Sequence, residues 1–460
     1  SGGTQTYNGG LTTTGVAGTV TLNGTIASSD DAVVLGAVTL GSATTIDTNS
    51  TTTNRADITI AAITGGSNTL TLTTENNVTG SDITASGAIG GVTTLTLASV
   101  GGTATLSADV DVTTLTVDNT VANVAFTGNG SSVTSAVAFA NDGTLTLGTS
   151  GGTQTYNAGL TTTSVGSTVT LNGTIATSDD AVVLGAVTLG SNTVVDTNST
   201  TTNRADITIA AITGGSNALT LTTENNVTGS DVTASGNISG VTTLTLASVG
   251  GTATLSGDVD VTTLTVGNTV ANVLLTGSGT SVTNAVTFAN DGTLTIGDAA
   301  GDTFVFDGGL TENTSGTVTL AGSIDSSNDD ITFGAITLAA ATTLDTNAAD
   351  TTGDIIIGAV TSTNLNLTLD TTGTTGSADH TFTGDITLGS GGALSVTGDV
   401  VLGANVLIIA GGITFNNDIN ADNATNNDRT LTMSSGTGST ISVTGNVGTS
   451  QALAGLTIIQ

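Results

Sequence analysis

The sequence predicts an all-β fold, namely a parallel β-helix (a β-solenoid) in which two or three short strands make one coil. Three observations lead to this prediction. Threonine alternates with leucine, isoleucine or valine in short phrases throughout the chain. These phrases begin roughly every 10 to 13 residues, separated by Gly, Asn, Asp or Ser clusters. Long stretches also return at a fixed offset. A tandem array of β-sandwiches is the alternative architecture.

The phrase at 92–99 is typical of the predicted strands, and it recurs letter for letter at 241–248. Side chains alternate between the two faces of a strand, so Leu95 and Leu97 point to one side. Thr94 and Thr96 then point to the other side. Each such phrase is therefore expected to be a short strand with one buried aliphatic face and one hydroxyl-lined face.

Self-comparison divides the chain into three repeat units, at 1–149, 150–298 and 299–460, which we expect to form one continuous solenoid. The segment 1–8 returns as 150–157, an offset of 149 residues, and the second unit is a near duplicate of the first. The third unit begins near Ala299 and is diverged. Such an array grows in one dimension without thickening its core.

The inventory of side chains favours the solenoid over the sandwich. The chain has 64 Gly, no Pro, no Trp and only 2% aromatic residues. Val, Ile, Leu and Ala suit a narrow coil interior, whereas a sandwich core usually needs larger residues. Glycine supplies the positive φ angles of tight corners. Proline would delete a hydrogen-bond donor from a strand that is paired on both edges. With roughly 20 to 23 residues per coil, the chain makes about 20 coils.

The charge excludes several classes of function. The net charge is −33, Lys is absent and only three Arg are present. Such a chain repels nucleic acid and anionic lipid and attracts divalent cations. The absence of Cys excludes disulfides and cysteine metal sites. No apolar run has the length of a membrane span. Because Ser1 lies in mid-pattern without signal-peptide anatomy, we expect either a removed leader or a segment of a longer protein.

Acidic turns are the candidate metal ligands. Adjacent carboxylates can hold Ca²⁺ through hard oxygen ligands, and one such pair follows hydroxyl or amide residues in each unit. A second pattern places two carboxylates on one strand face. Weak divalent binding that screens self-repulsion is expected rather than a tight cage, and the alternative is a set of solvated corner residues. No other cofactor is expected. The candidate ligands are Asp30, Asp31, Asp179, Asp180, Asp329 and Asp330, and then Asp109, Asp111, Asp258 and Asp260.

The few basic residues suggest structure rather than catalysis. Arg55 and Arg204 are expected to pair with Asp57 and Asp206, or with an Asp of the next coil. Arg429 has the same interpretation. His380 is the only histidine, and without Cys, Lys or a nucleophile motif it makes no catalytic constellation. The chain is therefore not expected to be an enzyme.

Phrases such as 141–148 (NDGTLTLG) and 382–388 (FTGDITL) resemble the large repetitive surface proteins of Gram-negative bacteria. These are the filamentous-haemagglutinin-like and autotransporter-like adhesins. The resemblance spans the whole chain as one of style and composition, and it carries over no site residues. It implies a right-handed parallel β-helix that is exported to the cell surface and serves in stalks, fibres, adhesion or biofilm formation.

The expected function is a structural extracellular fibre or stalk. The strand pattern runs to both ends of the sequence and leaves open sheet edges. We therefore expect the chain to continue or to stack end to end with copies of itself. One alternative is an adhesin segment that binds glycans or Ca²⁺. Another is a subunit of an S-layer or sheath. Flat arrays of outward threonine also suggest ice binding, but the phrases are unevenly spaced and β-branched Thr suits any solvated strand face.

Overall fold

The computed structural model describes residues 2–49, 55–74, 79–197, 204–223, 228–346, 352–371, 379–422 and 429–460. Strands make up 59% of the structure, all strand pairing is parallel, and about 19 turns are stacked, with no helix among these residues. The predicted β-solenoid is therefore confirmed. The alternative of tandem sandwiches is excluded, because sandwich sheets are antiparallel. The chain divides into two compact units, unit 1 (Ser1–Val232) and unit 2 (Thr233–Gln460).

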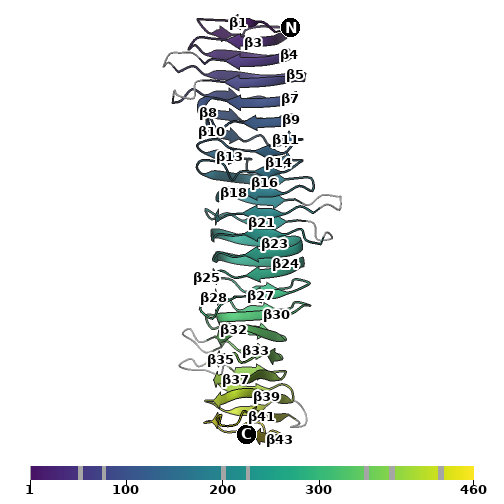
Figure 1. Ribbon diagram of the computed structural model, residues 1–460, viewed down its shortest axis with the longest axis vertical. Coiled ribbons are helices and arrows are strands. Elements are labelled where there is room, and N and C mark those ends of the chain that lie inside the picture. Colours follow the sequence, from purple (N-terminus) through teal and green to yellow (C-terminus); the bar gives the residue numbers. More distant parts are fainter. Residues whose placement is uncertain are drawn as a thin grey trace. The chain divides into compact units, whose positions relative to one another are not determined.

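The strands of unit 1 are short, with longer ones where two segments join across a corner. They are β1 (Thr4–Thr6), β2 (Leu11–Thr12), β3 (Val20–Ala27), β4 (Val33–Asp47), β5 (Ile58–Thr73), β6 (Ile83–Ala85), β7 (Ile89–Ala98), β8 (Val100–Leu106), β9 (Val110–Val117), β10 (Val121–Phe126), β11 (Ser132–Val133), β12 (Val137–Ala138), β13 (Leu145–Leu147), β14 (Thr153–Tyr156), β15 (Leu160–Thr161), β16 (Val169–Ala176), β17 (Val182–Leu184), β18 (Val187–Asp196), β19 (Ile207–Ile209), β20 (Ile212–Thr213) and β21 (Leu219–Thr222). Figure 1 shows β4, β5, β7 and β9 one above another.

The strand β22 (Val232–Ala234) includes the boundary between the units, and unit 2 has the same construction. Its strands are β23 (Ile238–Leu255), β24 (Val259–Leu275), β25 (Gly279–Val282), β26 (Val286–Phe288), β27 (Leu294–Ile296), β28 (Thr303–Phe306), β29 (Leu310–Glu312), β30 (Val318–Asp325), β31 (Ile331–Phe333), β32 (Ile336–Asp345), β33 (Ile355–Ile357), β34 (Val360–Thr361), β35 (Leu367–Asp370), β36 (Asp379–Phe382), β37 (Ile386–Thr397), β38 (Asp399–Leu402), β39 (Val406–Phe415), β40 (Ile419–Ala421), β41 (Thr430–Ser435), β42 (Ile441–Val443) and β43 (Gly455–Ile459).

The alternation of side chains follows the prediction. Leu95 and Leu97 of β7 are fully buried, whereas Thr94 and Thr96 are partly exposed. Leu95 lies between Leu70 of the preceding coil and a leucine of the following coil. Stacks of this kind fill the interior with aliphatic side chains, each of which contributes about 1.5–3 kcal/mol on burial.

Each coil passes through three strand segments. In unit 1, for example, β13, β14 and β15 pair with the first half of β16, the second half of β16 and β17. The turn between the two halves of β16 is made by Gly173, at φ +64, where a Cβ atom would lie 2.4 Å from the Thr149 carbonyl oxygen. Only glycine fits this close approach without strain.

The 149-residue repeat does not contain a whole number of coils. In unit 1, successive coils stack Val33 in one column with Ile58, Ile83, Ala104, Val124, Leu145, Val169 and Val187. The residue that matches Val33 in the second repeat is Val182, which pairs instead with Leu160 and Ile207. Matching residues of the first two repeats therefore lie in different columns, one strand segment apart.

Candidate functional site

The first predicted acidic pair lies in a tight turn held by its own hydroxyl. Ser28 Oγ donates a hydrogen bond to the backbone oxygen of Asp31, and Asp30 has a φ of 62°. The second copy is alike, with Thr177 donating to the Asp180 oxygen and Asp179 at a φ of 63°. Asp and Asn are among the few non-glycine residues that adopt this conformation readily. The turn therefore explains the first aspartate of each pair.

In the third copy the equivalent pair is shifted by one residue. Ser326 Oγ donates to the Asp329 oxygen, and the residue with positive φ, 78°, is Asn328. Asn328–Asp329 thus occupies the place of Asp30–Asp31, and Asp330 stands where the first two copies have alanine. The sequence comparison had matched Asp329 and Asp330 to the other pairs, which the turn geometry corrects.

In the first two copies, the first aspartate of the pair has one buried carboxylate oxygen. Oδ1 of Asp30 and Oδ1 of Asp179 are buried and accept no hydrogen bond, and Asp179 is only 7% exposed. However, the part of the chain that the structure describes contains no group of three or more His, Cys, Asp or Glu residues arranged to hold a metal ion. Calcium binding at these turns stays a prediction.

In the second group of predicted ligands, the first aspartate of each pair bonds the backbone and the second faces solvent. Oδ1 of Asp109 accepts the backbone N–H of Gly130 at 2.7 Å, and Oδ1 of Asp258 accepts that of Gly279 at 2.8 Å. Each bond joins residues 21 positions apart and so links one coil to the next. Asp111 and Asp260 point outward and are exposed. Partial loss of solvent around its carboxylate, and then the charge of Asp258, raises the pKa of Asp260.

Coil-to-coil hydrogen bonds from corner side chains to the backbone recur throughout both units. In each, a carboxylate or amide oxygen accepts an N–H of the following coil, which satisfies a donor where the strand ladder is interrupted. The asparagines among these acceptors thus bond the backbone of the next coil. Examples are Asn123 with Thr144, Asn272 with Thr293, Asp385 with Leu407 and Asn405 with Thr430, each at 2.8–2.9 Å.

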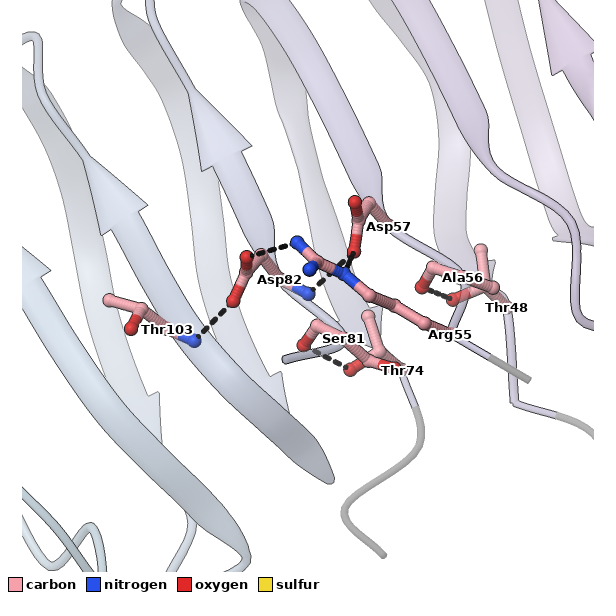
Figure 2. A network of polar contacts seen from close by, with 8 residues as sticks. All are labelled: Thr48, Arg55, Ala56, Asp57, Thr74, Ser81, Asp82 and Thr103. Atoms are coloured by element: carbon pink, nitrogen blue, oxygen red, sulfur yellow. Dashed lines mark hydrogen bonds and ion pairs between the residues drawn. The ribbon is translucent and has the colours of Figure 1, made fainter. Parts of the chain in front are cut away.

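The most elaborate polar cluster includes Thr48, Arg55–Asp57, Thr74 and Ser81–Asp82, at a corner of the coil that we call the loop corner (Figure 2). Arg55 Nε contacts Oδ1 of Asp57 at 3.1 Å, and its Nη2 contacts Oδ2 of Asp82 at 2.8 Å. Asp57 Oδ1 also accepts the N–H of Asp82 at 2.9 Å, and Asp82 Oδ1 accepts that of Thr103 at 2.7 Å. The guanidinium therefore bridges two carboxylates of successive coils.

Two buried threonines form hydrogen bonds to the backbone at the loop corner. The hydroxyl of Thr48 donates to the Ala56 oxygen at 2.9 Å, and that of Thr74 donates to the Ser81 oxygen at 3.2 Å. These bonds join Thr48 to the residue after Arg55, and Thr74 to the residue before Asp82. The carboxylates of the loop corner are consequently held in position by the coil.

The second copy reproduces the loop corner closely. Arg204 contacts Asp206 at 3.0 Å and Asp231 at 2.9 Å. The predicted pairing of both arginines, with an Asp two residues on and with an Asp of the next coil, is confirmed. Arg429 also forms an ion pair, with Asp422 at 2.8 Å. In the third copy, Thr352 takes the place of the arginine, and its hydroxyl donates to the Asn328 oxygen.

The third copy retains and extends the carboxylates. Asp354 Oδ1 accepts the N–H of Asp379 at 2.9 Å, and Asp379 lies in register with Asp399. Burial, and then the charges of Asp354 and Asp399, raises the pKa of Asp379 to about 6. On the neighbouring strand segment, burial and the charges of Asp345 and Asp307 raise the pKa of Asp325 to about 6. Negative charge is therefore most concentrated in this copy.

His380 lies inside the coil. It is fully buried, with Nε2 3.1 Å from the Thr397 oxygen and 3.3 Å from the Thr371 hydroxyl. Its ring centroid is 6.5 Å from that of Phe382. Burial lowers its pKa to about 4. His380 is thus neutral near pH 7 and has the structural environment that we expected.

None of the described residues belongs to a helix of the length and apolar character that crossing a bilayer requires. Comparisons with family models, with curated proteins and with solved structures find no match to this chain. What supports a function is therefore the fold and the placement of its side chains. By these, the chain is a repetitive β-solenoid protein.

Proposed function

We propose that this chain is a structural part of a fibre or stalk at the bacterial surface, of the filamentous-haemagglutinin-like or autotransporter-like kind. The observation that carries the proposal is the use made of its polar residues. Asp57, Asp109 and Asp258 each bind the backbone of the next coil, and the arginines bridge coils. These charged side chains therefore stabilise the contact between successive coils.

The surface of β1 supports stacking on a further coil. Gln154 and Tyr156 of β14 are fully covered, with Gln154 Nε2 donating to the Phe126 oxygen at 2.8 Å and Tyr156 packing on the Phe126 ring. Their counterparts in the first repeat are Gln5, in β1, and Tyr7, just after it. Gln5 is exposed and Tyr7 is partly exposed. Because the residues are the same, a further coil could cover Gln5 and Tyr7 as the preceding coil covers Gln154 and Tyr156.

The strand β43 presents a similar surface. Leu456, Ile458 and Ile459 are 44%, 56% and 49% exposed, although the sequence around them resembles that of the other strands. A further coil, whether of the same polypeptide or of a second copy, would bury these side chains and pair with the free edge of β43. Burial of this apolar area would favour continuation of the stack.

Small-angle X-ray scattering and electron microscopy of the purified chain test the proposal. If the two units continue along one axis, as a fibre requires, about 19 turns at a spacing of ~4.8 Å give a particle on the order of 90 Å long and much narrower. Longer particles at high concentration would support end-to-end stacking. Immunogold labelling on the surface of intact source cells is also expected. Compact particles, or labelling confined to the cell interior, would rule the proposal out.

A further inference from the structure

The three copies of the loop corner offer an internal comparison. In two of them an arginine bridges a pair of stacked carboxylates, and in the third the carboxylates remain but the arginine is replaced. This difference between the copies does not depend on whether the chain forms a fibre.

The first two copies show which cation the carboxylate pair accepts. Arg55 and Arg204 each use Nε for the aspartate two residues on and Nη2 for the aspartate of the next coil, and the four distances lie between 2.8 and 3.1 Å. The planar fork of a guanidinium matches two oxygens held at fixed positions, which a spherical ammonium does not. The pair is therefore a guanidinium site in both copies.

The third copy keeps the geometry of the pair. Ile355 pairs with His380 as Ile58 pairs with Ile83, so Asp354 and Asp379 correspond to Asp57 and Asp82. The backbone bond between the two aspartates is also retained, at 2.9 Å in both copies. Asp354 thus accepts a backbone N–H of the next coil as Asp57 does, and Asp379 takes the register position of Asp82.

The third copy also carries more negative charge than the first. Asp399 occupies the place of Thr103, in register with Asp379. Among the described basic side chains, Arg55, Arg204 and Arg429 pair with other aspartates. Burial, and then the charges of Asp354 and Asp399, raises the pKa of Asp379.

The site is accessible from solvent. Asp354 and Asp379 are both partly exposed. A cleft of about 530 Å³ opens on the Asp379 side and is lined by Asp379, Asp399, Asn420, Asp422 and Gln451 among others, without Asp354. Asp422 is the ion-pair partner of Arg429. The lining of the cleft is acidic and polar, and its volume suffices for a side chain. A cation that enters it reaches the Asp379 carboxylate from outside the coil.

We propose that Asp354 and Asp379 form a docking site for an arginine side chain presented by a partner protein, with Asp399 adding to the attraction. The partner is not a second copy of this chain, because its three arginines are already paired. A guanidinium is favoured over a metal ion, since the corresponding aspartates bind a guanidinium in the other two copies. The partner is instead a basic protein with an exposed arginine.

Titration with N-acetyl-arginine amide at constant ionic strength tests the site. The NMR signals of ¹³C-labelled aspartate carboxyls report the binding. We expect saturable shifts of the Asp354 and Asp379 signals at millimolar probe, and binding about fivefold weaker for N-acetyl-lysine amide. Thr352→Arg restores the arginine of the other copies, so the probe should then bind at least about tenfold more weakly. Asp379→Asn should weaken binding similarly.

Three results would overturn the proposal. Equal responses to the arginine probe, the lysine probe and NaCl would reveal general charge screening. Undiminished binding to Thr352→Arg would place the probe elsewhere, and this variant remains informative even if Asp379→Asn fails to fold. Saturable displacement of the probe by micromolar CaCl₂ would identify the site as a metal site.

Discussion

Oδ1 of Asp57 accepts the backbone N–H of Asp82, 25 residues later, at a distance of 2.9 Å. The bond joins two coils at a corner, where the strand ladder has no partner for this donor. Equivalent bonds occur at Asp206 and Asp354. Much of the acidic character of this chain therefore has a structural use, because an aspartate or asparagine at a corner can serve the coil that follows it.

This relationship predicts how substitutions at Asp57 affect stability. Asp57→Ala removes the acceptor of the Asp82 N–H and leaves Arg55 with one carboxylate, so the free energy of unfolding should fall by about 1–2 kcal/mol. Asp57→Asn keeps an acceptor oxygen and should cost less. Arg55→Ala should have the smallest effect, since its side chain is 55% exposed and exposed ion pairs contribute little. Urea unfolding measures all three variants, and a larger loss for Arg55→Ala than for Asp57→Ala would contradict this order.

The raised pKa of Asp379 predicts that its charge destabilises the fold above about pH 6. The folded state holds the proton more tightly than the unfolded state, whose aspartate pKa is about 3.9. The penalty is thus absent below about pH 4, grows as the pH rises through 4 to 6, and is complete above 6. Asp379→Asn should unfold at a higher temperature than the parent chain at pH 7.5, and the two should converge at pH 4.

Asp418→Asn is the matched control, because its effect on the unfolding temperature should have the opposite sign. Hydrogen bonding from the Asn446 backbone lowers the pKa of Asp418, so its carboxylate stabilises the fold at neutral pH. Asp418→Asn should therefore lower the unfolding temperature at pH 7.5, and this loss should shrink as the pH falls through the lowered pKa. If both variants changed stability in the same direction at pH 7.5, the assignment of opposite environments would be wrong.

His380 predicts acid sensitivity of unit 2. Its folded pKa of about 4 lies below the unfolded value of about 6.5, so the unfolded state binds more protons between these values. Stability contributed by neutral His380 is complete above about pH 6.5 and is lost as the pH falls toward 4. His380→Val matches the aliphatic neighbours Ile355 and Val400 in its column.

Thermal unfolding between pH 4 and 7 in the His380→Val chain measures this contribution. The variant should lose less stability on acidification than the parent chain. An unchanged pH profile would mean that the histidine is solvated or already charged in the folded state.

The net charge of −33 predicts how salts act on stability. Screening of self-repulsion should raise the unfolding temperature gradually with ionic strength. CaCl₂ and MgCl₂ should act alike at equal concentration, because the predicted ligands include aspartates already used for coil-to-coil bonds. Differential scanning calorimetry compares the two salts, and a saturable rise with micromolar Ca²⁺ alone would instead indicate a specific calcium site.

The strands and the core were predictable from the sequence because they depend on local alternation. Leu95 and Leu97 are buried and Thr94 and Thr96 partly exposed, as a side-chain period of two requires. The pairing of Arg55 was also foreseen, since an Asp two residues away and an Asp of the next coil are the carboxylates within its reach. These features follow from residues that are close in the chain or related by one coil.

The phase of the repeats was not predictable, because coil length varies along the chain. Val33 pairs with Ile58, 25 residues later, whereas Val169 pairs with Val187 after only 18. A fixed offset of 149 residues therefore does not reveal which column a residue joins. The variable coil length also hid which backbone N–H each corner aspartate accepts. The correspondence of Asn328 with Asp30 was predictable, in contrast, because two offsets of 149 residues separate them.

Disulfide formation between engineered cysteines tests the coil-on-coil register most directly, because the chain contains no natural cysteine. Thr71 and Thr96 are register partners on successive coils, at a spacing of ~4.8 Å that a disulfide can bridge. Thr71→Cys with Thr96→Cys should cross-link within one chain under mild oxidation of a dilute sample, as resolved by non-reducing electrophoresis. Thr71→Cys with Thr94→Cys, two residues out of register, should remain mostly reduced. Equal cross-linking of both pairs, or none in the first, would contradict the stacked solenoid.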